Sequence, residues 1–325
     1  YISGFATLAE RIHAFGAQAI LQIQHSGNEA AFGEKVSASD VSSRVMGGVP
    51  RPLQVGEIEQ LIDCFAQTAL RAQKAGFDGV EVHAAHGYLL NQFLSPYFNR
   101  RTDIYGGTLE NRARFVVEII KNIKERLGPR FAVTVRYSAR EYIEGGLDVE
   151  ESVQLGQIFE QAGADVLHVA SAVYDSGIFI SGPASVPHGM FVPVAKQIKQ
   201  VVNVPVIVVG RFNDPVFVDK VLQEEAGDLI AFGRAFLADP KFPQKVEQNR
   251  FEEIRRCIGC KYCGMRVASN LDVRCAIDPI TGRERFYDEN TESRNPQHVL
   301  VIGGGPAGMQ TAIWAKRLGH QVRLV

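Results

Sequence analysis

Short apolar runs alternate with amphipathic stretches along most of this chain, and this alternation restricts the fold more than any other feature. The apolar runs are short enough for strands, and the stretches between them carry apolar residues at helical spacing. Regular strand–helix order predicts an α/β fold with a parallel sheet. Three helical stretches are clear, namely residues 58–72 ended by Gly76, residues 115–123 ended by Gly128, and one opened by the capping pair Asp148 and Glu151.

Six strands can be placed in this way, whereas a closed (βα)8 barrel needs eight. The predicted strands cover residues 19–24, 79–83, 131–137, 166–170, 205–209 and 229–232. The last two run into Gly210-Arg211 and Gly233-Arg234, and TIM barrels often bind phosphate after strands seven and eight. We therefore expect a TIM barrel whose first two strands precede Tyr1. The alternative is that these are ordinary loop glycines beside exposed arginines.

Composition narrows the functional class. The chain has 325 residues, 46% of them hydrophobic, which is enough for one large core, or for one large and one partial core. A net charge of -1, with both signs interspersed, argues against a nucleic-acid partner. The sequence lacks an apolar run of roughly 18 residues, so we expect no membrane span. Four of the five cysteines fall within one short segment, which favours a metal site in a reducing, cytoplasmic compartment.

That cysteine segment has the spacing of a cluster-binding loop. Cys257, Cys260 and Cys263 form C-x2-C-x2-C, and Cys275 follows after eleven residues. Two consecutive x2 gaps make a tight loop of thiolates, which favours a 4Fe-4S cluster. Zinc remains the alternative, although structural zinc sites usually pair two separated C-x2-C halves. The fifth cysteine, Cys64, is expected to be a small buried hydrophobe inside a helix.

A glycine motif lies near the end of the sequence. Gly303, Gly305 and Gly308 form G-x-G-x-x-G directly after the apolar run 299–302 and before a helical stretch. In that context the loop amides and helix N-terminus would hold a dinucleotide pyrophosphate. The spacing does not distinguish FAD from NAD. Residues 280–297 are polar and are predicted to be a linker.

Three polar residues lie at or just after the C-terminal end of the strand at 79–83, the end where barrel active sites lie. His83 and His86 could both donate to one substrate oxygen, and Tyr88 carries a proton that a transition state could take. Each residue could instead be structural. Zinc binding by the histidines is a further alternative, but no third ligand is evident.

Residues 83–112, HAAHGYLLNQFLSPYFNRRTDIYGGTLENR, resemble the signature of the Old Yellow Enzyme family of FMN oxidoreductases. With CIGCKYC and VLVIGGGPAGM, the whole chain resembles the family's long iron–sulfur subgroup, which includes 2-enoate reductase, 2,4-dienoyl-CoA reductase and trimethylamine dehydrogenase. The resemblance implies an FMN-binding TIM barrel over residues 1–250, a cluster segment with a linker over 251–296, and the start of a Rossmann-like FAD/NAD(P)-binding domain over 297–325.

The resemblance also implies roles for individual residues. Gln22 matches a glutamine that hydrogen-bonds the flavin pyrimidine edge, and Arg136 matches an arginine near flavin N1. Other positions match the FMN phosphate site (Gly210, Arg211, Gly233 and Arg234), the carbonyl-gripping pair (His83 and His86), the proton donor (Tyr88) and the cluster ligands (Cys257, Cys260, Cys263 and Cys275). A last group is expected to order the loop rather than do chemistry: Asn99, Arg101, Tyr105, Gly106, Gly107, Asn111 and Arg112.

The implied activity is NAD(P)H-dependent reduction of an activated C=C bond in a small unsaturated carbonyl compound. Electrons would pass through FAD, the cluster and FMN, and a homo-oligomer is possible. The first alternative is an amine dehydrogenase of the trimethylamine dehydrogenase type. The paired donors His83 and His86 favour a carbonyl substrate, because a cationic amine needs an aromatic bowl. The second alternative is a silent scaffold or electron-transfer module.

Overall fold

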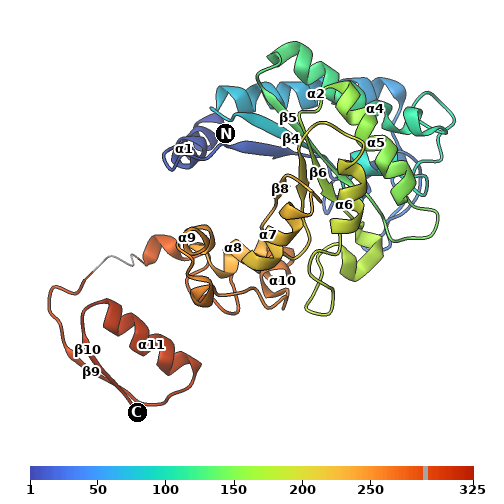
Figure 1. The fold of residues 1–325 in the computed structure, drawn as a ribbon. Helices are drawn as coiled ribbons and strands as arrows, with labels where there is room; N and C mark the ends of the chain where they lie inside the picture. Colours follow the sequence, from blue (N-terminus) through green and yellow to red (C-terminus); the bar gives the residue numbers. More distant parts are fainter. Residues whose placement is uncertain (288–291) are drawn as a thin grey trace. The chain divides into compact units, whose positions relative to one another are not determined.

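Six parallel strands form the central sheet of the computed structural model, which describes residues 1–287 and 292–325. The hydrogen-bonded order is β1-β4-β5-β6-β7-β8 (Figure 1). The strands are β1 (Ile20–Ile23), β4 (Gly79–Ala84), β5 (Ala132–Ser138), β6 (Val166–Ala170), β7 (Val206–Val208) and β8 (Leu229–Ile230). All six predicted strands are therefore confirmed. A separate short pair joins β2 (Val36–Ser37) to β3 (Arg51–Pro52).

Helices follow the strands as the alternation predicts. Only α1 (Ile2–His13) precedes β1 in the described chain. The later helices are α2 (Val55–Lys74), α3 (Leu89–Leu94), α4 (Leu109–Leu127), α5 (Val149–Ala162), α6 (Val192–Lys199), α7 (Pro215–Gln223), α8 (Arg234–Ala238) and α9 (Phe242–Glu247). The predicted cap is confirmed, since Asp148 Oδ1 accepts from the Glu151 amide at 3.1 Å. Gly128 ends α4 with φ +79, a conformation that glycine adopts without steric cost.

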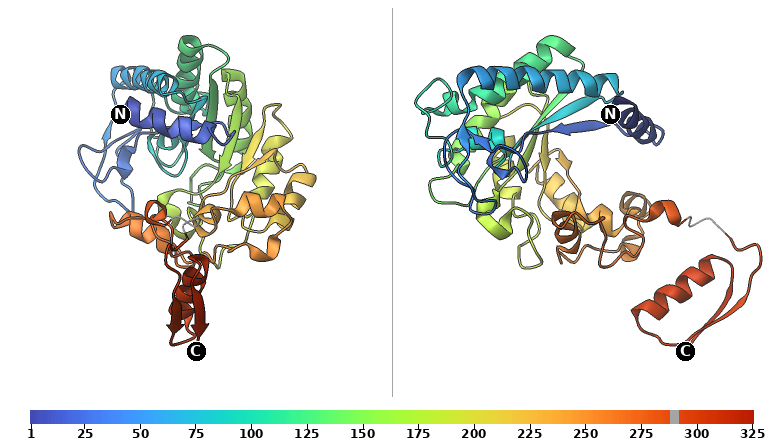
Figure 2. Two further views of the ribbon diagram at one scale, coloured as in Figure 1. Left: turned by 90° about the vertical axis from the view of Figure 1, so that its left-hand side faces the viewer. Right: turned by 180° about the vertical axis from the view of Figure 1, so that it is seen from behind.

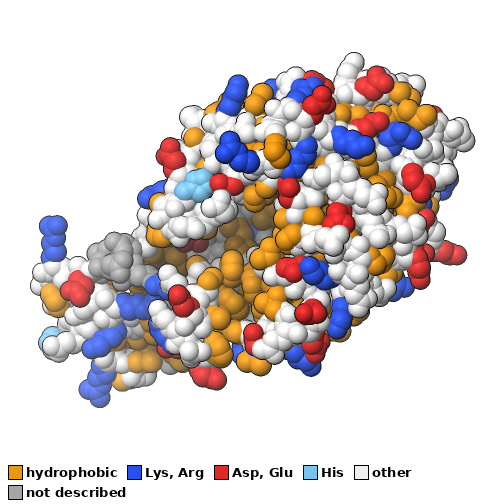
Figure 3. All heavy atoms as spheres, turned by 45° about the horizontal axis from the view of Figure 1, so that its top comes forward, with side chains coloured by type: hydrophobic (Ala, Val, Ile, Leu, Met, Phe, Trp, Pro, Cys, Tyr) orange, Lys and Arg blue, Asp and Glu red, His pale blue; other side chains and the backbone are white. Residues whose placement is uncertain are grey.

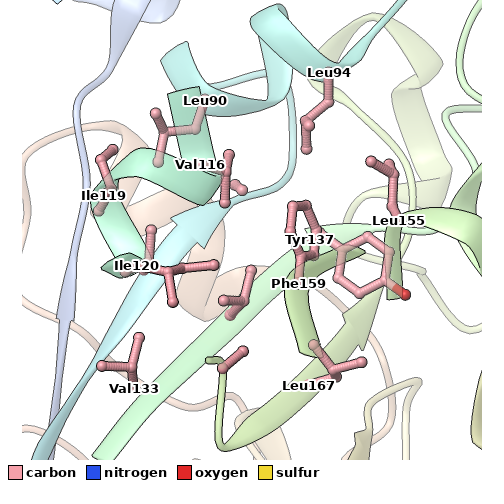
Figure 4. Close-up of a cluster of buried hydrophobic side chains, with 14 of the residues drawn as sticks. Leu90, Leu94, Val116, Ile119, Ile120, Val133, Tyr137, Leu155, Phe159 and Leu167 are labelled. Carbon is pink, nitrogen blue, oxygen red and sulfur yellow. The ribbon is translucent and has the colours of Figure 1, made fainter. Parts of the chain in front are cut away.

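The two faces of the sheet differ in polarity because side chains alternate along a strand. One face carries buried apolar residues that pack under α2, α4 and α5, which lie side by side over it (Figures 1 and 2). Figure 4 shows part of this core, with Val133, Tyr137 and Leu167 from the sheet meeting Ile120 and Phe159 from the helices. The alternate positions, among them Glu81, His83, Arg136 and His168, are polar. The candidate site is built on this second face.

The position of Cys64 corrects one prediction. Cys64 is exposed on α2 rather than buried. The buried residues of this helix are Ile58, Ile62, Phe65, Ala66, Ala69 and Ala72, and position 64 lies outside that stripe. The apolar stripe of a helix is narrow, so a position inside a helix is not by itself enough to bury this residue.

Contacts group the chain into two compact units, Tyr1–Lys261 and Tyr262–Val325. The first contains the sheet and its helices. The second contains α10 (Tyr262–Ala268) and a parallel β9–α11–β10 element formed by His298–Val301, Pro306–Arg317 and Gln321–Leu324. The predicted three-part division stays a prediction, and residues 288–291 of the predicted linker lie outside the described residues.

The glycine motif occupies the turn between β9 and α11, as predicted from its context. Gly303 has φ +106, and a Cβ on Gly308 would collide with the Gly303 carbonyl oxygen. Gly305 differs, because a Cβ there would meet nothing within 4 Å. Gly308 is therefore required for close packing of the turn. At Gly305 the turn has open space where a side chain would lie.

This difference predicts that two alanine variants differ in stability. Gly308→Ala should destabilise the β9–α11–β10 element by about 1–3 kcal/mol, the usual cost of overpacking. Gly305→Ala should leave that element stable. Hydrogen exchange of the β9 and α11 amides measures both effects. Equal protection in the two variants would contradict the steric role of Gly308.

The surface carries charges of both signs. In the face seen in Figure 3, Lys and Arg side chains alternate with Asp and Glu side chains. Among the described residues, no helix is both long enough and apolar enough to cross a membrane.

Candidate active site on the polar face of the sheet

A chain of hydrogen bonds joins three strands on the polar face. Gln22 on β1 donates its side-chain amide to Glu81 Oε1 on β4 at 2.5 Å. His168 Nδ1 on β6 lies 2.7 Å from Glu81 Oε2. Arg136 on β5 stands between these strands, paired in register with His83 on one side and His168 on the other. The predicted flavin-edge residues Gln22 and Arg136 thus lie in one polar layer.

Glu81 and His168 were not singled out from the sequence. Both occupy strands whose other residues are mostly apolar, GVEVHA and VLHVA. A charged or titratable residue inside such a strand was the available signal, because buried polar groups need partners.

The two predicted carbonyl-gripping histidines contact each other. His86 Nδ1 lies 3.3 Å from His83 Nε2, and their ring centroids are 5.1 Å apart. His86 adopts φ +64, and its amide donates to Ser138 Oγ at 2.9 Å. Burial and the nearby Arg136 lower the pKa of both imidazoles, that of His83 to about 4. The rings are therefore neutral at pH 7, and their mutual hydrogen bond uses one of the two N–H groups.

The lowered pKa of His83 predicts how stability depends on pH. The folded-state pKa of about 4 lies below the unfolded value of 6.5, so the unfolded chain binds the proton more readily between these values. Stability should fall as pH drops from 6.5 towards 4. For His83 alone the loss between pH 7 and pH 5 should be about 2 kcal/mol.

Urea unfolding of the His83→Gln variant at pH 7 and pH 5 measures this contribution. The variant should lose less stability on acidification than the wild type. The exposed-site variant His298→Gln should keep the wild-type loss. An unchanged loss in His83→Gln would show that His83 is not the responsible group.

Tyr88, the predicted proton donor, has a phenolic partner. Its hydroxyl lies 2.8 Å from the hydroxyl of Tyr174, and the two rings meet edge to face at 5.6 Å. Tyr88 also lies beside His83, with ring centroids 5.4 Å apart. Burial, together with the Tyr174 hydrogen bond, raises the pKa of Tyr88 above its usual value, so the phenol keeps its proton. Tyr174 lies in the segment that follows β6.

A buried carboxyl group accompanies the two phenols. Glu29 is only 7% exposed, and burial raises its pKa to about 7, with Asp175 contributing repulsion. Glu29 also interacts electrostatically with Tyr88. An acidic group near neutral pKa thus stands close to the predicted proton donor.

A second buried carboxyl group holds the loop that carries His86 and Tyr88. Glu141 accepts from Asn91 Nδ2 at 2.9 Å, from Ser95 Oγ at 2.6 Å and from the Leu147 amide at 2.8 Å. Asn91 Oδ1 in turn accepts from the Gly87 amide at 2.6 Å. Gly87, between His86 and Tyr88, is therefore tied to the protein interior.

The signature residues after this loop order the chain, as expected. Asn99 Nδ2 donates to the carbonyls of Phe93 and Tyr105 at 2.7 and 2.8 Å. Arg112 donates to the Leu94 carbonyl at 2.6 Å and pairs with Glu151. Arg101 donates to two further backbone carbonyls at 3.0 and 2.7 Å. None of these guanidinium or amide contacts involves the polar face.

Two arginines stand together at the predicted phosphate site. Arg211 Nη1 donates to the Ala184 carbonyl at 3.1 Å, and Arg234 Nη1 donates to the Gly182 carbonyl at 2.8 Å. Burial, and then the positive charge of Arg234, lowers the pKa of Arg211. Gly210 precedes Arg211 with φ +151, and a Cβ on Gly233 would meet nothing within 4 Å. Two adjacent cations beside open backbone suit an anion such as a phosphate.

These features fit the FMN that the resemblance implies. Among the described residues, Arg136 Nε, His83 Nδ1 and His168 Nε2 are buried without a hydrogen-bond partner. Buried polar atoms normally have hydrogen-bond partners, so a group of such atoms without partners indicates a site for a polar ligand. The arginine pair would hold the phosphate, and Gln22 and Arg136 would contact the flavin ring.

The four predicted cluster ligands are distributed over both units. Cys257 and Cys260 belong to the first, and Cys263 and Cys275 to the second. In the described part of the chain, no three His, Cys, Asp or Glu side chains are arranged to hold a metal ion. The iron–sulfur site therefore stays a prediction.

Comparison with known proteins then identifies the family. The sequence profile of the NADH:flavin oxidoreductase / NADH oxidase family matches residues 1–253. The chain belongs to this family. The resemblance to the Old Yellow Enzyme family is thereby confirmed.

Individual members of the NADH:flavin oxidoreductase family match over nearly the whole chain. An "NADH oxidase" of Thermoanaerobacter brockii is 44% identical and covers 100% of this chain and 51% of its own length. A "Cinnamate reductase" of Clostridium sporogenes is 36% identical, covering 98% and 51% respectively. The chain thus spans about half the length of these relatives.

Solved structures of similar proteins confirm the TIM-barrel-like α/β fold. A 2-naphthoyl-CoA reductase complexed with 2-naphthoyl-CoA superimposes with a TM-score of 0.94 at 31% identity, covering 99% of this chain and 52% of that protein. Histamine dehydrogenase from Rhizobium sp. 4-9 gives a TM-score of 0.91 at 30% identity, covering 99% and 48%. Both a 2-naphthoyl-CoA reductase and a histamine dehydrogenase are thus similar in fold to this chain.

Proposed function

We propose that the protein is an NAD(P)H-dependent reductase that saturates an activated C=C bond in an enoate, enone or enoyl thioester. The observation that carries this proposal is the convergence of His83, His86 and Tyr88 beside buried, unpartnered polar atoms on one face of the sheet. The reaction adds a hydride to the β-carbon and a proton to the α-carbon, while NAD(P)H is oxidised. Bound FMN would supply the hydride.

The histidines would hold the substrate carbonyl oxygen. When His83 Nε2 donates to His86 Nδ1, the neutral His86 ring keeps its Nε2–H for the substrate. This hydrogen bond strengthens as negative charge develops on the oxygen after hydride addition. Both rings could donate to the same oxygen only after their mutual hydrogen bond opens.

Tyr88 would complete the reaction by protonating the α-carbon. Its hydroxyl is held by Tyr174, and its raised pKa keeps the proton available at neutral pH. The enolate formed by hydride addition is a stronger base than a neutral carbonyl compound, so it can take this proton. Glu29 stands near enough to influence the charge on Tyr88 afterwards.

A 4Fe-4S cluster and FAD are proposed as the route by which electrons reach FMN. In support, Gly259 and Lys261 have φ +69 and +61 on either side of Cys260. A left-handed residue beside a right-handed one can turn successive amides towards one point, and anion-binding nests of this kind occur at many iron–sulfur sites. The β9–α11–β10 element carries the glycine turn that would hold the FAD or NAD(P)H pyrophosphate.

An amine dehydrogenase is the second candidate. The edge-to-face pair of Tyr88 and Tyr174, with the buried carboxyl of Glu29 nearby, could receive a cationic amine. The similar structure of a histamine dehydrogenase accords with this reading. The neutral histidine pair accords better with a carbonyl substrate.

Anaerobic stopped-flow measurements distinguish the candidates. The protein would be reduced with NADH or NADPH and then mixed with an enone, a 2-enoate or an enoyl thioester. We expect at least one alkene to reoxidise the flavin, and we expect methylated amines not to reduce it. Flavin reduction by an amine without reoxidation by any alkene would establish the second candidate. Inertness towards both classes would indicate an electron-transfer module.

A further inference from the structure

Glu81 occupies the centre of the polar layer. Its two oxygens bind different partners, Gln22 Nε2 at 2.5 Å and His168 Nδ1 at 2.7 Å. Its side chain is 12% exposed and that of His168 is 9% exposed, so the contact between these two side chains is largely shielded from water, whereas Gln22 is exposed. Glu81 is paired in register with Gln22 and lies two residues before His83 on the same face of β4.

The charges in this layer can be assigned. Burial raises the pKa of Glu81, but its interactions with His168, then Arg136 and Gln22, more than offset this effect, and the pKa lies below its usual value. Burial lowers the pKa of His168. Glu81 is therefore an anion, and His168 is neutral. Arg136 is a cation, and the negative charge of Glu81 partly cancels its positive field.

The hydrogen-bonding polarity of the layer follows from the same contacts. A carboxylate only accepts, so His168 must carry its proton on Nδ1 and present a lone pair at Nε2. That Nε2 is buried and has no partner among the described residues. Gln22 gives its amide N–H to Glu81, so its carbonyl oxygen remains to accept from a ligand. Glu81 thus makes both neighbours present acceptors.

We propose that Glu81 is a positioning residue that orients Gln22 and His168 as hydrogen-bond acceptors towards the flavin. Its negative charge also reduces the stabilisation that Arg136 gives to the reduced flavin. The inference rests on the proposed binding of FMN. Reduction places negative charge on the flavin ring, which a nearby cation stabilises. A carboxylate in the same layer opposes that effect. Glu81 thereby lowers the reduction potential of the bound flavin and makes it a stronger hydride donor.

The test replaces the carboxylate with an amide of the same size. In Glu81→Gln holoprotein, the ratio of affinities for reduced and oxidised FMN should rise by about tenfold, a positive shift of about 30 mV for a two-electron couple. Equilibration with redox dyes measures this potential. The control is Glu160→Gln on α5, whose carboxylate accepts from the Asn203 and Val204 amides and lies on the apolar side of the sheet. This control should keep the wild-type potential.

A double variant separates the effect of the Glu81 charge on the flavin potential from a nonspecific disturbance of the structure. On an Arg136→Met background, which should itself lower the potential, Glu81→Gln should still raise it by about as much as in the wild type, because the fields of two charges on the flavin add. The tautomer gives a second readout in the wild type, and it does not depend on the folding of any variant. The ¹⁵N chemical shifts of His168 should show Nδ1 protonated and Nε2 unprotonated.

The possible outcomes have different meanings. An unchanged potential in Glu81→Gln that still binds FMN would overturn this inference and leave the proposed reductase intact. A wild-type His168 with its proton on Nε2 would also overturn it. Failure of the wild-type protein to bind FMN would instead reject the proposed function on which the inference rests.

Discussion

Tyr88→Phe is expected to slow reoxidation of the reduced flavin by an alkene by roughly 10² to 10⁴, the usual contribution of a positioned general acid. The substitution keeps the aromatic ring beside His83 and removes the only acidic proton of this side chain. Loss of the Tyr174 hydrogen bond should cost only about 0.5–1.5 kcal/mol, so the fold should survive. Substrate affinity should change little, because the histidines hold the carbonyl. Stopped-flow reoxidation of the pre-reduced protein measures the rate.

Tyr174→Phe is the matched control. It removes the same hydrogen bond while leaving the Tyr88 proton in place, so its rate should fall far less. Flavin reduction by NAD(P)H should be normal in both variants. If Tyr88→Phe reoxidises at the wild-type rate, water or another residue is the acid. If it loses FMN, the role of Tyr88 is structural.

Cys260→Ala is expected to abolish the cluster and with it the reduction of FMN by NAD(P)H. The anaerobically prepared wild type should contain about four irons and four sulfides per chain, as a 4Fe-4S site requires. Cys260 lies between the two left-handed residues of the proposed nest, so its thiolate would be central to the loop. Iron and sulfide analysis, together with the visible spectrum, measures the loss. Chemically reduced FMN in the variant should still reduce an alkene.

Cys64→Ala provides the control, since Cys64 is exposed on α2 and outside the cluster segment. Its iron content should equal that of the wild type. Stoichiometric zinc in place of iron after anaerobic preparation would reject the cluster and favour the zinc alternative. Full iron content in Cys260→Ala would show that this cysteine is not a ligand.

Local pattern in the sequence was enough to predict the elements and the mouth of the site. Strand and helix positions follow from the spacing of apolar residues and from caps such as Asp148, all of which act over a few residues. His83, His86 and Tyr88 could be grouped because one short segment carries all three. The turn at Gly303 was recognisable for the same reason.

Tertiary structure alone decided how the polar layer is connected. Gln22, Glu81 and His168 come from three strands that are far apart in the sequence, and their contacts depend on strand order and register. Spacing within one strand carries no information about the neighbour across the sheet. Tyr174 reaches Tyr88 from a loop 86 residues away, and the mutual contact of the two histidines depends on the left-handed backbone at His86. The sequence by itself determined which segments form the barrel-like sheet and which residue types line its mouth. Only long-range packing decided which atoms are paired and which are left for a ligand, because hydrogen-bond partners are set by distances in space.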